Sequence, residues 1–190
     1  MRFEWMALAM AAVLAAGPAM AQQRIDVANE GGIRDAWMLA DGVALVAPQY
    51  PQAWLGRHDT VCLGVGYLLN PDGTTSNFTM VKGWNSATGT SEPAPGYWAA
   101  FAEAAADALK QWRFKPRPEV RQAKPVYTVA TFVFGTGEQR SEARAQCGIT
   151  NLAARLRELR GATGHRNLAG SDILDRLDLD PANQAYNNMR

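Results

Sequence analysis

The chain has 190 residues, with 19 basic and 18 acidic side chains and a formal net charge of +1. This balance excludes a nucleic-acid-binding protein that relies on bulk electrostatics, and the length allows one or two domains. Hydrophobic residues make up 47% and charged residues 19% of the chain, which is enough apolar material for a buried core. Two cysteines are too few for a scaffold built from disulfides, although they suffice for one bridge.

The first 21 residues have the pattern of a secretory signal peptide. Arg2 gives a basic start, Trp5 to Ala16 is an apolar run, and Ala19 and Ala21 provide a small-residue cleavage site. The run is shorter than the roughly 20 residues that cross a bilayer, so an inner-membrane anchor through an uncleaved signal is the weaker alternative. We therefore predict a periplasmic protein with no stable membrane anchor after processing.

Residues 22–47 form a weakly patterned lead-in, in which Val43 to Ala47 is compatible with a short strand. Residues 60–69 alternate with a period of two, which predicts a strand. One face carries Val61, Leu63, Val65, Tyr67 and Leu69, and the other carries Thr60, Cys62, Gly64, Gly66 and Leu68. A tight turn at residues 70–73 leads to a returning strand at 74–82, so the two segments predict a hairpin.

Residues 96–112 predict an amphipathic helix, because Phe101, Ala105, Ala108 and Trp112 recur at helical spacing. Pro116 and Pro118 end this helix, and residues 125–134 predict a third strand rich in β-branched and aromatic side chains. These elements predict an α+β fold in which a small three-stranded antiparallel sheet packs on one long helix.

The last 55 residues, 136–190, predict a helical C-terminal extension. Thr150 is a candidate cap for a helix that carries three leucines on one face and ends near Gly161. Ser171 is a candidate cap for a second, shorter helix.

Residues 48–135 resemble the C-terminal domain of TonB energy transducers. The resemblance rests on the order of Tyr50-Pro51, a strand, Asp72-Gly73, a strand, a helix and a last apolar strand, and is most specific over Ala108 to Pro116. The residues themselves indicate that the helix and the segment after it supply the core, namely Phe101, Ala105, Ala108, Trp112, Phe114 and Pro116.

The resemblance implies a periplasmic protein-binding domain that takes part in transport across the outer membrane. Members of the family add an extended peptide of an outer-membrane transporter as a strand beside their last strand. On this chain that strand consists of Val126, Tyr127, Thr128, Val129, Ala130, Thr131, Phe132, Val133 and Phe134. Two alternatives stay open: the lead-in Val43 to Ala47 covers this edge, or the edge is solvated.

The chain departs from the family pattern in three ways. It shows neither an N-terminal transmembrane helix nor a long proline-rich spacer, and residues 136–190 have no counterpart. Arg57-His58-Asp59 replaces the glycine that usually precedes the first strand. A stand-alone envelope binding or assembly module without energy coupling is therefore the alternative function.

The tail suggests a role for the two cysteines. Cys62 lies on the strand face that carries Gly64 and Gly66, where a helix could approach closely, and Cys147 precedes the expected tail helix. We predict a Cys62–Cys147 disulfide that fixes the tail to the sheet, with two buried thiols as the alternative.

The sequence carries no pattern of an enzyme, and we expect neither a cofactor nor a metal site. The two histidines lie in no nucleophile, metal or cofactor motif. Residues 110–124 carry six basic side chains and one acidic side chain, which favours a solvated basic loop over a site for an acidic envelope partner.

Overall fold

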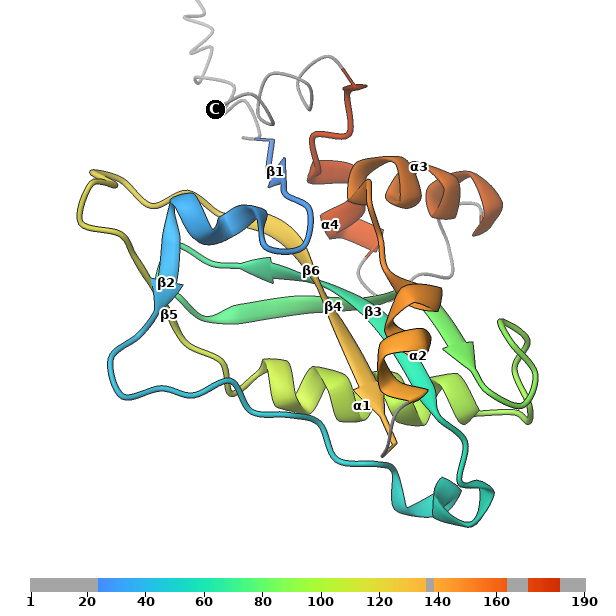
Figure 1. Ribbon diagram of the computed structural model, residues 1–190. Coiled ribbons are helices and arrows are strands. Elements are labelled where there is room, and N and C mark those ends of the chain that lie inside the picture. The colour runs from blue at the N-terminus through green and yellow to red at the C-terminus, as the bar shows by residue number, and fades with distance from the viewer. Residues whose placement is uncertain (1–23, 136–138, 164–170, 182–190) are drawn as a thin grey trace, which may run out of the picture.

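The computed structural model describes residues 24–135, 139–163 and 171–181 (Figure 1). The signal segment predicted for residues 1–21 lies outside these ranges. In chain order the elements are β1 (Asp26–Val27), the 3-10 helix η1 (Gly32–Asp35), β2 (Trp37–Leu39), the 3-10 helix η2 (Gln52–Arg57), β3 (Val61–Leu69), β4 (Thr75–Asn85), α1 (Tyr97–Leu109), β5 (Phe114–Pro116), β6 (Val126–Phe134), α2 (Gln139–Cys147), α3 (Leu152–Thr163) and α4 (Ser171–Arg176). Over the described ranges, every helix is too short or too polar to cross a bilayer.

The β3-β4 hairpin forms where the sequence predicts it. Its turn closes through a hydrogen bond from the Gly73 N–H to the Asn70 carbonyl, with a donor–acceptor distance of 2.9 Å. Gly73 has a φ of 82°, and a Cβ atom there would collide with the Phe114 carbonyl at the start of β5. Glycine is therefore needed both for the turn and for the close approach of β5.

The α+β class is confirmed, but the prediction of three antiparallel strands is wrong. The main sheet has the order β1-β6-β3-β4, and β1 runs parallel to β6 while the other pairs are antiparallel. The added strand forms because Ile25 and Val27 are buried under the tail helices, and Ile25 exchanges backbone hydrogen bonds with Arg176 and Asp178. Strands β2 and β5 form a separate antiparallel pair.

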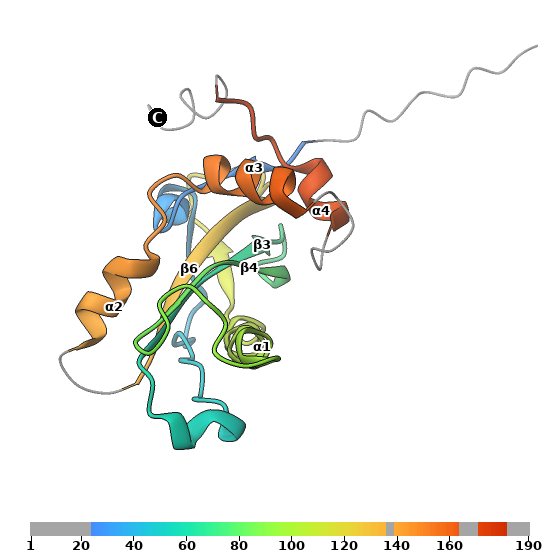
Figure 2. The same ribbon diagram turned by 90° about the vertical axis from the view of Figure 1, so that its right-hand side faces the viewer.

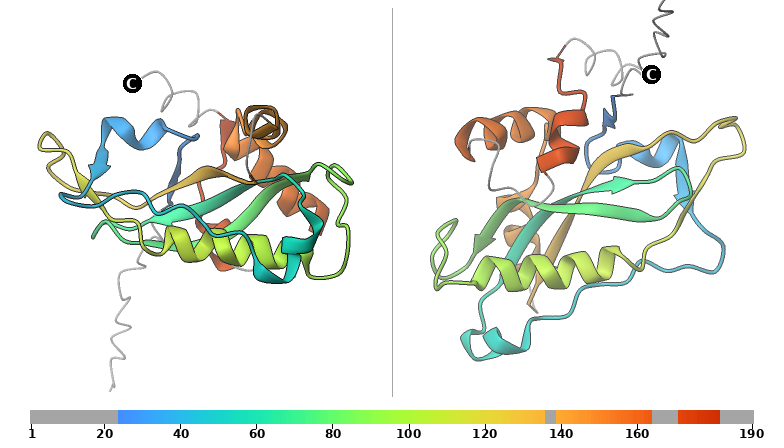
Figure 3. Two further views of the ribbon diagram at one scale, coloured as in Figure 1. Left: turned by 60° about the horizontal axis from the view of Figure 1, so that its bottom comes forward. Right: turned by 180° about the vertical axis from the view of Figure 1, so that it is seen from behind.

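The interpretation of Val43 to Ala47 as a strand is also wrong. These residues have no regular secondary structure and run past α1, as the views in Figure 3 show for the chain between β2 and η2. The lead-in contributes its strands earlier, at β1 and β2, where buried apolar residues meet the sheet and the segment after α1.

Helices cover both faces of the main sheet (Figure 2). The first face packs on α1, and its core contains the odd-numbered residues of β3 together with Ala130, Phe132 and Phe134. The opposite face packs on α3 and α4 through Leu68, Tyr127 and Val129, and on α2 through Cys62 and Val133. The alternation of residues 61–69 therefore correctly assigned the two faces of β3.

The helices of the C-terminal extension differ from the prediction in their number and in the start and end of α3. Helix α2, which the sequence analysis did not predict, precedes α3. The cap of α3 is Asn151, whose Oδ1 accepts from the Ala154 N–H at 2.9 Å, so the choice of Thr150 is wrong. The helix continues through Gly161 to Thr163. Helix α4 begins at Ser171, whose side chain lies outside the described part.

The predicted disulfide is present between Cys62 on β3 and Cys147 at the end of α2, and their Cα atoms are 6.0 Å apart. Both residues are fully buried and pack with Ala143. Ile149, which follows α2, fills the space over Gly64, where a Cβ atom would lie only 2.8 Å from its Cδ1. The small residues of β3 thus allow the tail to lie directly on the sheet.

Candidate functional site

Strand β6 has two edges along which its backbone N–H and C=O groups point, one toward β3 and one away from it; we call the second edge the outward flank. Successive residues of an antiparallel ladder turn their N–H and C=O groups to opposite sides. Thr131 turns away from β3, because both of its backbone groups bind side chains outside the ladder. The alternation places Tyr127, Val129 and Val133 on this outward flank as well. The remaining residues of the predicted partner-binding strand turn toward β3, namely Val126, Thr128, Ala130, Phe132 and Phe134.

The lead-in occupies the first part of the outward flank. Ala28 donates its N–H to the Tyr127 carbonyl at 2.9 Å, next to the two-residue pairing of β1 with β6. The chain then turns at Gly31, which has a φ of 78°, and leaves the ladder. Among the described residues, no strand pairs with this flank from Thr131 to Phe134.

Two side chains, rather than a neighbouring strand, form hydrogen bonds with the outward backbone groups of Thr131. The Glu30 carboxylate accepts from the Thr131 N–H at 3.0 Å and from its hydroxyl at 2.8 Å. Arg144 on α2 donates to the Thr131 carbonyl at 3.0 Å and to Glu30 at 2.8 Å. We call Glu30 and Arg144 the Thr131 clasp. The carboxylate takes the position of a neighbouring strand's carbonyl, and the guanidinium takes that of its N–H group.

The flank beyond the clasp is the floor of a groove of about 980 Å³, which we call the β6 groove. One wall is formed by the lead-in and η2, and the other by α2. Leu45, Val46 and Leu55 line it with exposures of 50%, 37% and 44%. In the described part of the chain the only other exposed large apolar residue is Met38, at 36%. A concentration of exposed apolar side chains in a groove is typical of a binding site.

Trp112 holds the apolar wall in place. Its side chain lies in the core, where it contacts the rings of Tyr67, Phe114 and Phe132. Its Nε1 donates to the Val46 carbonyl at 2.9 Å. The residue that the sequence indicated as part of the core therefore also positions the lead-in beside β6.

The other predicted core residues lie around α1. Phe101 and Ala105 are fully buried against the sheet, and Ala108 is buried beside them. Phe114 is half-buried and packs against the same core. Pro116 is half-buried in β5, where it pairs with Trp37.

One end of the β6 groove is braced by a buried carboxylate. Asp59 accepts a hydrogen bond from Arg57 Nε at 2.7 Å and another from the Tyr97 hydroxyl at 3.0 Å. Burial raises the pKa of Tyr97, and the hydrogen bond to Asp59 raises it further. The hydrogen bond to Asp59 likewise raises the pKa of Arg57. These contacts join η2, which carries Leu55, to the segment before β3 and to α1.

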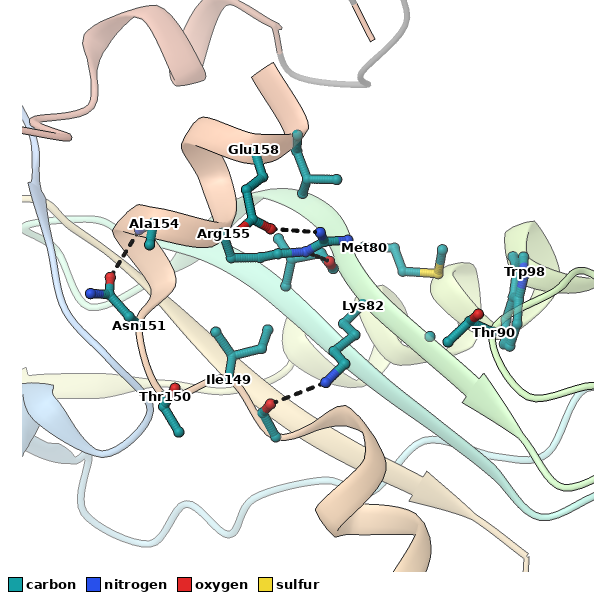
Figure 4. A pocket seen from close by; sticks show the side chains of 14 residues that line it. Met80, Lys82, Thr90, Trp98, Ile149, Thr150, Asn151, Ala154, Arg155 and Glu158 are labelled. Carbon is teal, nitrogen blue, oxygen red and sulfur yellow. Dashed lines mark hydrogen bonds and ion pairs between the residues drawn. The ribbon is translucent and has the colours of Figure 1, made fainter. Parts of the chain in front are cut away.

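A second groove of about 770 Å³, which we call the β4 groove, follows the opposite edge of the sheet (Figure 4). Arg155 on α3 donates to the Val81 carbonyl at 2.8 Å and pairs with Glu158 at 3.0 Å. Lys82 donates to the Gly148 carbonyl. Both cations of this groove therefore already have partners within the chain.

The described residues contain no group of three or more histidine, cysteine, aspartate or glutamate side chains that could hold a metal ion. Residues 110–124, the predicted basic loop, contact the lead-in: Lys115 pairs with Asp41 at 2.6 Å, and Arg117 bonds the Arg34 carbonyl. Lys115 and Arg117 thus join β5 and the residue that follows it to the N-terminal segment.

Comparison with solved structures finds a structural likeness. The solution NMR structure of the Pseudomonas aeruginosa TonB C-terminal domain is similar to this chain, with 16% sequence identity and a TM-score of 0.40. The match covers 55% of this chain and 90% of that one. No family model and no curated protein matches the chain.

Sequence reasoning located β6 but missed the residues that shape its outward flank. Glu30 and Arg144 are 114 positions apart and belong to no motif. Leu45 and Val46 were assigned to a strand rather than to an exposed wall. The one available signal was the apolar run from Val43 to Ala47, for which the sequence indicates no strand that it could pair with.

Proposed function

We propose that the protein binds an extended segment of a partner protein by strand addition on the outward flank of β6, from Thr131 to Phe134. The observation that carries the proposal is the Thr131 clasp at the entrance of the β6 groove. It supplies one acceptor and one donor at the positions where a paired strand would supply them. A flank that is completed by side chains rather than by a strand is one that an incoming strand can complete instead.

The groove offers an incoming strand two kinds of stabilisation. Each backbone hydrogen bond to β6 contributes about 0.5–1.5 kcal/mol net. Covering Leu45, Val46 and Leu55 removes apolar surface from water, at about 25 cal/mol per Å². The backbone bonds would give affinity for any extended chain, and the apolar wall would favour some sequences over others.

We place this activity in the cell envelope. The N-terminal segment has the pattern of a secretory signal, and a disulfide between Cys62 and Cys147 is expected to persist outside the reducing cytosol. Engagement of an outer-membrane transporter, as in the family that residues 48–135 resemble, is the more specific form of the proposal. A stand-alone envelope binding module is its alternative.

Strand addition is tested by blocking one outward N–H group of the groove. Val133→Pro removes that donor and leaves the pairing of β6 with β3 intact, because Val133 faces outward. Val133→Ala is the matched control, since it shortens the same side chain and keeps the N–H group. We expect envelope proteins that the wild type and the alanine variant capture to be lost from the proline variant. Equal capture by a folded proline variant would overturn the proposal.

Fractionation separates the two forms of the envelope role. A processed protein that is recovered without membranes favours the stand-alone module. An uncleaved protein in the inner membrane that crosslinks to an outer-membrane transporter favours the transport role. Mass spectrometry of the purified N-terminus decides whether the signal is removed.

A further inference from the structure

The two faces of a strand that binds in the β6 groove would meet different side chains. Cross-strand neighbours share a face of the sheet. A ligand residue opposite Thr131 or Val133 would therefore point to the face of α2, because Val133 packs beside the disulfide and Ala143. The ligand residues between them would point to the face of α1, together with Phe132 and Phe134.

The α2 side of the groove is cationic. Arg140 and Arg144 both line the groove and are exposed. Arg140 donates to the Gly135 carbonyl at 2.9 Å, and it forms no ion pair with a carboxylate of the described residues. Arg144 pairs with Glu30, and an incoming strand takes the place of both side chains at Thr131, Glu30 at the N–H and Arg144 at the carbonyl. Once Glu30 is displaced, two arginines face the ligand on this side.

The α1 side of the groove is apolar. Leu45 and Val46 stand on the lead-in, and the hydrogen bond from Trp112 to the Val46 carbonyl holds them there. A polar side chain on this face of the ligand would lose water without gaining a partner, which costs free energy. An aliphatic side chain would cover the exposed wall instead.

Glu30 is an internal example of the group that fits the cationic side. Its carboxylate lies 2.8 Å from an Arg144 nitrogen while it also contacts the edge of β6. A carboxylate of a partner would find the same guanidinium at the same edge. On the basis of the strand addition proposed above, we propose that the partner segment is an extended peptide in which acidic residues alternate with aliphatic residues. Its acidic face binds Arg144 and Arg140, and its aliphatic face covers Leu45 and Val46.

The proposal is tested with three acetylated and amidated octapeptides against the full processed chain. The first alternates glutamate and valine, the second replaces each glutamate by lysine, and the third has the composition of the first with all glutamates placed before all valines. We expect the alternating acidic peptide to bind about tenfold more tightly than either of the others. We also expect the Val133 amide to become protected from hydrogen exchange only in that complex.

Charge reversal at the clasp sharpens the test. In Arg144→Glu the preference should shift toward the lysine peptide, and in Arg144→Gln, which keeps a donor for Thr131, the preference for glutamate should fall. Arg155→Glu is the matched control, because Arg155 also binds an outward carbonyl but lies on the β4 edge. A preference that does not change in either Arg144 variant would overturn the proposed specificity.

Other outcomes separate this proposal from the proposed function. Equal binding of the acidic and lysine peptides, both lost in Val133→Pro, would retain strand addition and overturn the acidic preference. Equal binding of the block peptide would overturn the alternating pattern. Failure of all three peptides, together with equal envelope capture by wild type and Val133→Pro, would overturn strand addition itself. A dimer of the chain that Val133→Pro abolishes would assign the groove to a second copy and overturn the peptide ligand.

Discussion

The two edges of the main sheet are closed by similar contacts but offer different surfaces. On the β6 edge Arg144 binds the Thr131 carbonyl, and on the β4 edge Arg155 binds the Val81 carbonyl. Val81 lies at an irregularity of the β3-β4 ladder, where the register shifts by one residue. An irregular edge with a charged side chain is a usual protection against unwanted strand pairing.

The difference lies in what surrounds each arginine. Arg155 is paired with Glu158 on its own helix, one turn away, so this contact forms wherever α3 forms. Arg144 is paired with Glu30 from the lead-in, and beside it the groove exposes Leu45 and Val46. The β4 edge is therefore protected by local contacts, whereas protection of the β6 edge depends on a distant segment that an incoming strand can displace. Variants that perturb one edge and leave the other intact test this difference.

Trp112→Ala should have the largest effect, because the indole packs in the core and also holds Val46. We expect the free energy of unfolding to fall by about 3–5 kcal/mol, as measured by chemical denaturation. Trp112→Phe keeps a ring in the core and removes the N–H donor. This second variant should lose less stability and still weaken peptide binding at the β6 groove, and unchanged binding would show that the wall does not depend on Trp112.

Removal of the disulfide should affect the β6 edge more than the β4 edge. The double variant Cys62→Ala, Cys147→Ala is expected to lose about 2–4 kcal/mol of stability and to loosen α2, which carries Arg144. Hydrogen exchange reports on this loosening at the amides of β6 and, for comparison, of β4. Equal acceleration at both edges would contradict a specific role of α2 in closing the β6 edge.

Alkaline pH should weaken the sheet beneath the β6 flank. Burial raises the pKa of Tyr127 to about 12, so the folded state favours the neutral phenol. In the unfolded state the Tyr127 phenol ionises near pH 10. Its contribution to the free energy of unfolding is therefore fully present below pH 10, and about 2–3 kcal/mol is lost as the pH rises from 10 toward 12. Tyr127→Phe should remove this share of the pH dependence. Parallel pH profiles of the two proteins would contradict it.

Arg155→Met should have the smallest effect and separates the two edges most directly. It leaves the Val81 carbonyl without its side-chain donor, which costs about 1 kcal/mol at a partly exposed position. We expect peptide binding at the β6 groove to be unchanged. Sedimentation would reveal new self-association if Arg155 protects the β4 edge, and a loss of peptide binding would show that the edges are coupled.

Much of the architecture could be predicted from local patterns. The alternation in residues 60–69 identified β3 and its two faces, and the turn residues before Thr75 identified the hairpin. Helix α1 followed from the spacing of its buried alanines and aromatics. Strand β1 could not be predicted, because two residues carry no periodicity and their burial depends on Leu177 and the tail helices.

For the candidate site, too, some features could be predicted from the sequence and others could not. Strand β6 was predicted as a unit, yet which of its residues face outward depends on the pairing with β3, since a shift of one residue would exchange the two flanks. The disulfide was inferred from a strip of small residues on β3. The Thr131 clasp was beyond reach, because only the folded chain brings Glu30 beside Arg144.

The sequence alone thus determined the elements whose signals are local: the hairpin, the long helix and the last strand, together with the two faces of β3 and the buried side of α1. The tertiary structure decided how the edges of the sheet are closed. Edge contacts join single residues from distant segments, and such contacts leave no periodic trace in the sequence. For this protein the proposed binding function depends on those contacts, at Thr131 and along the wall that Trp112 holds in place.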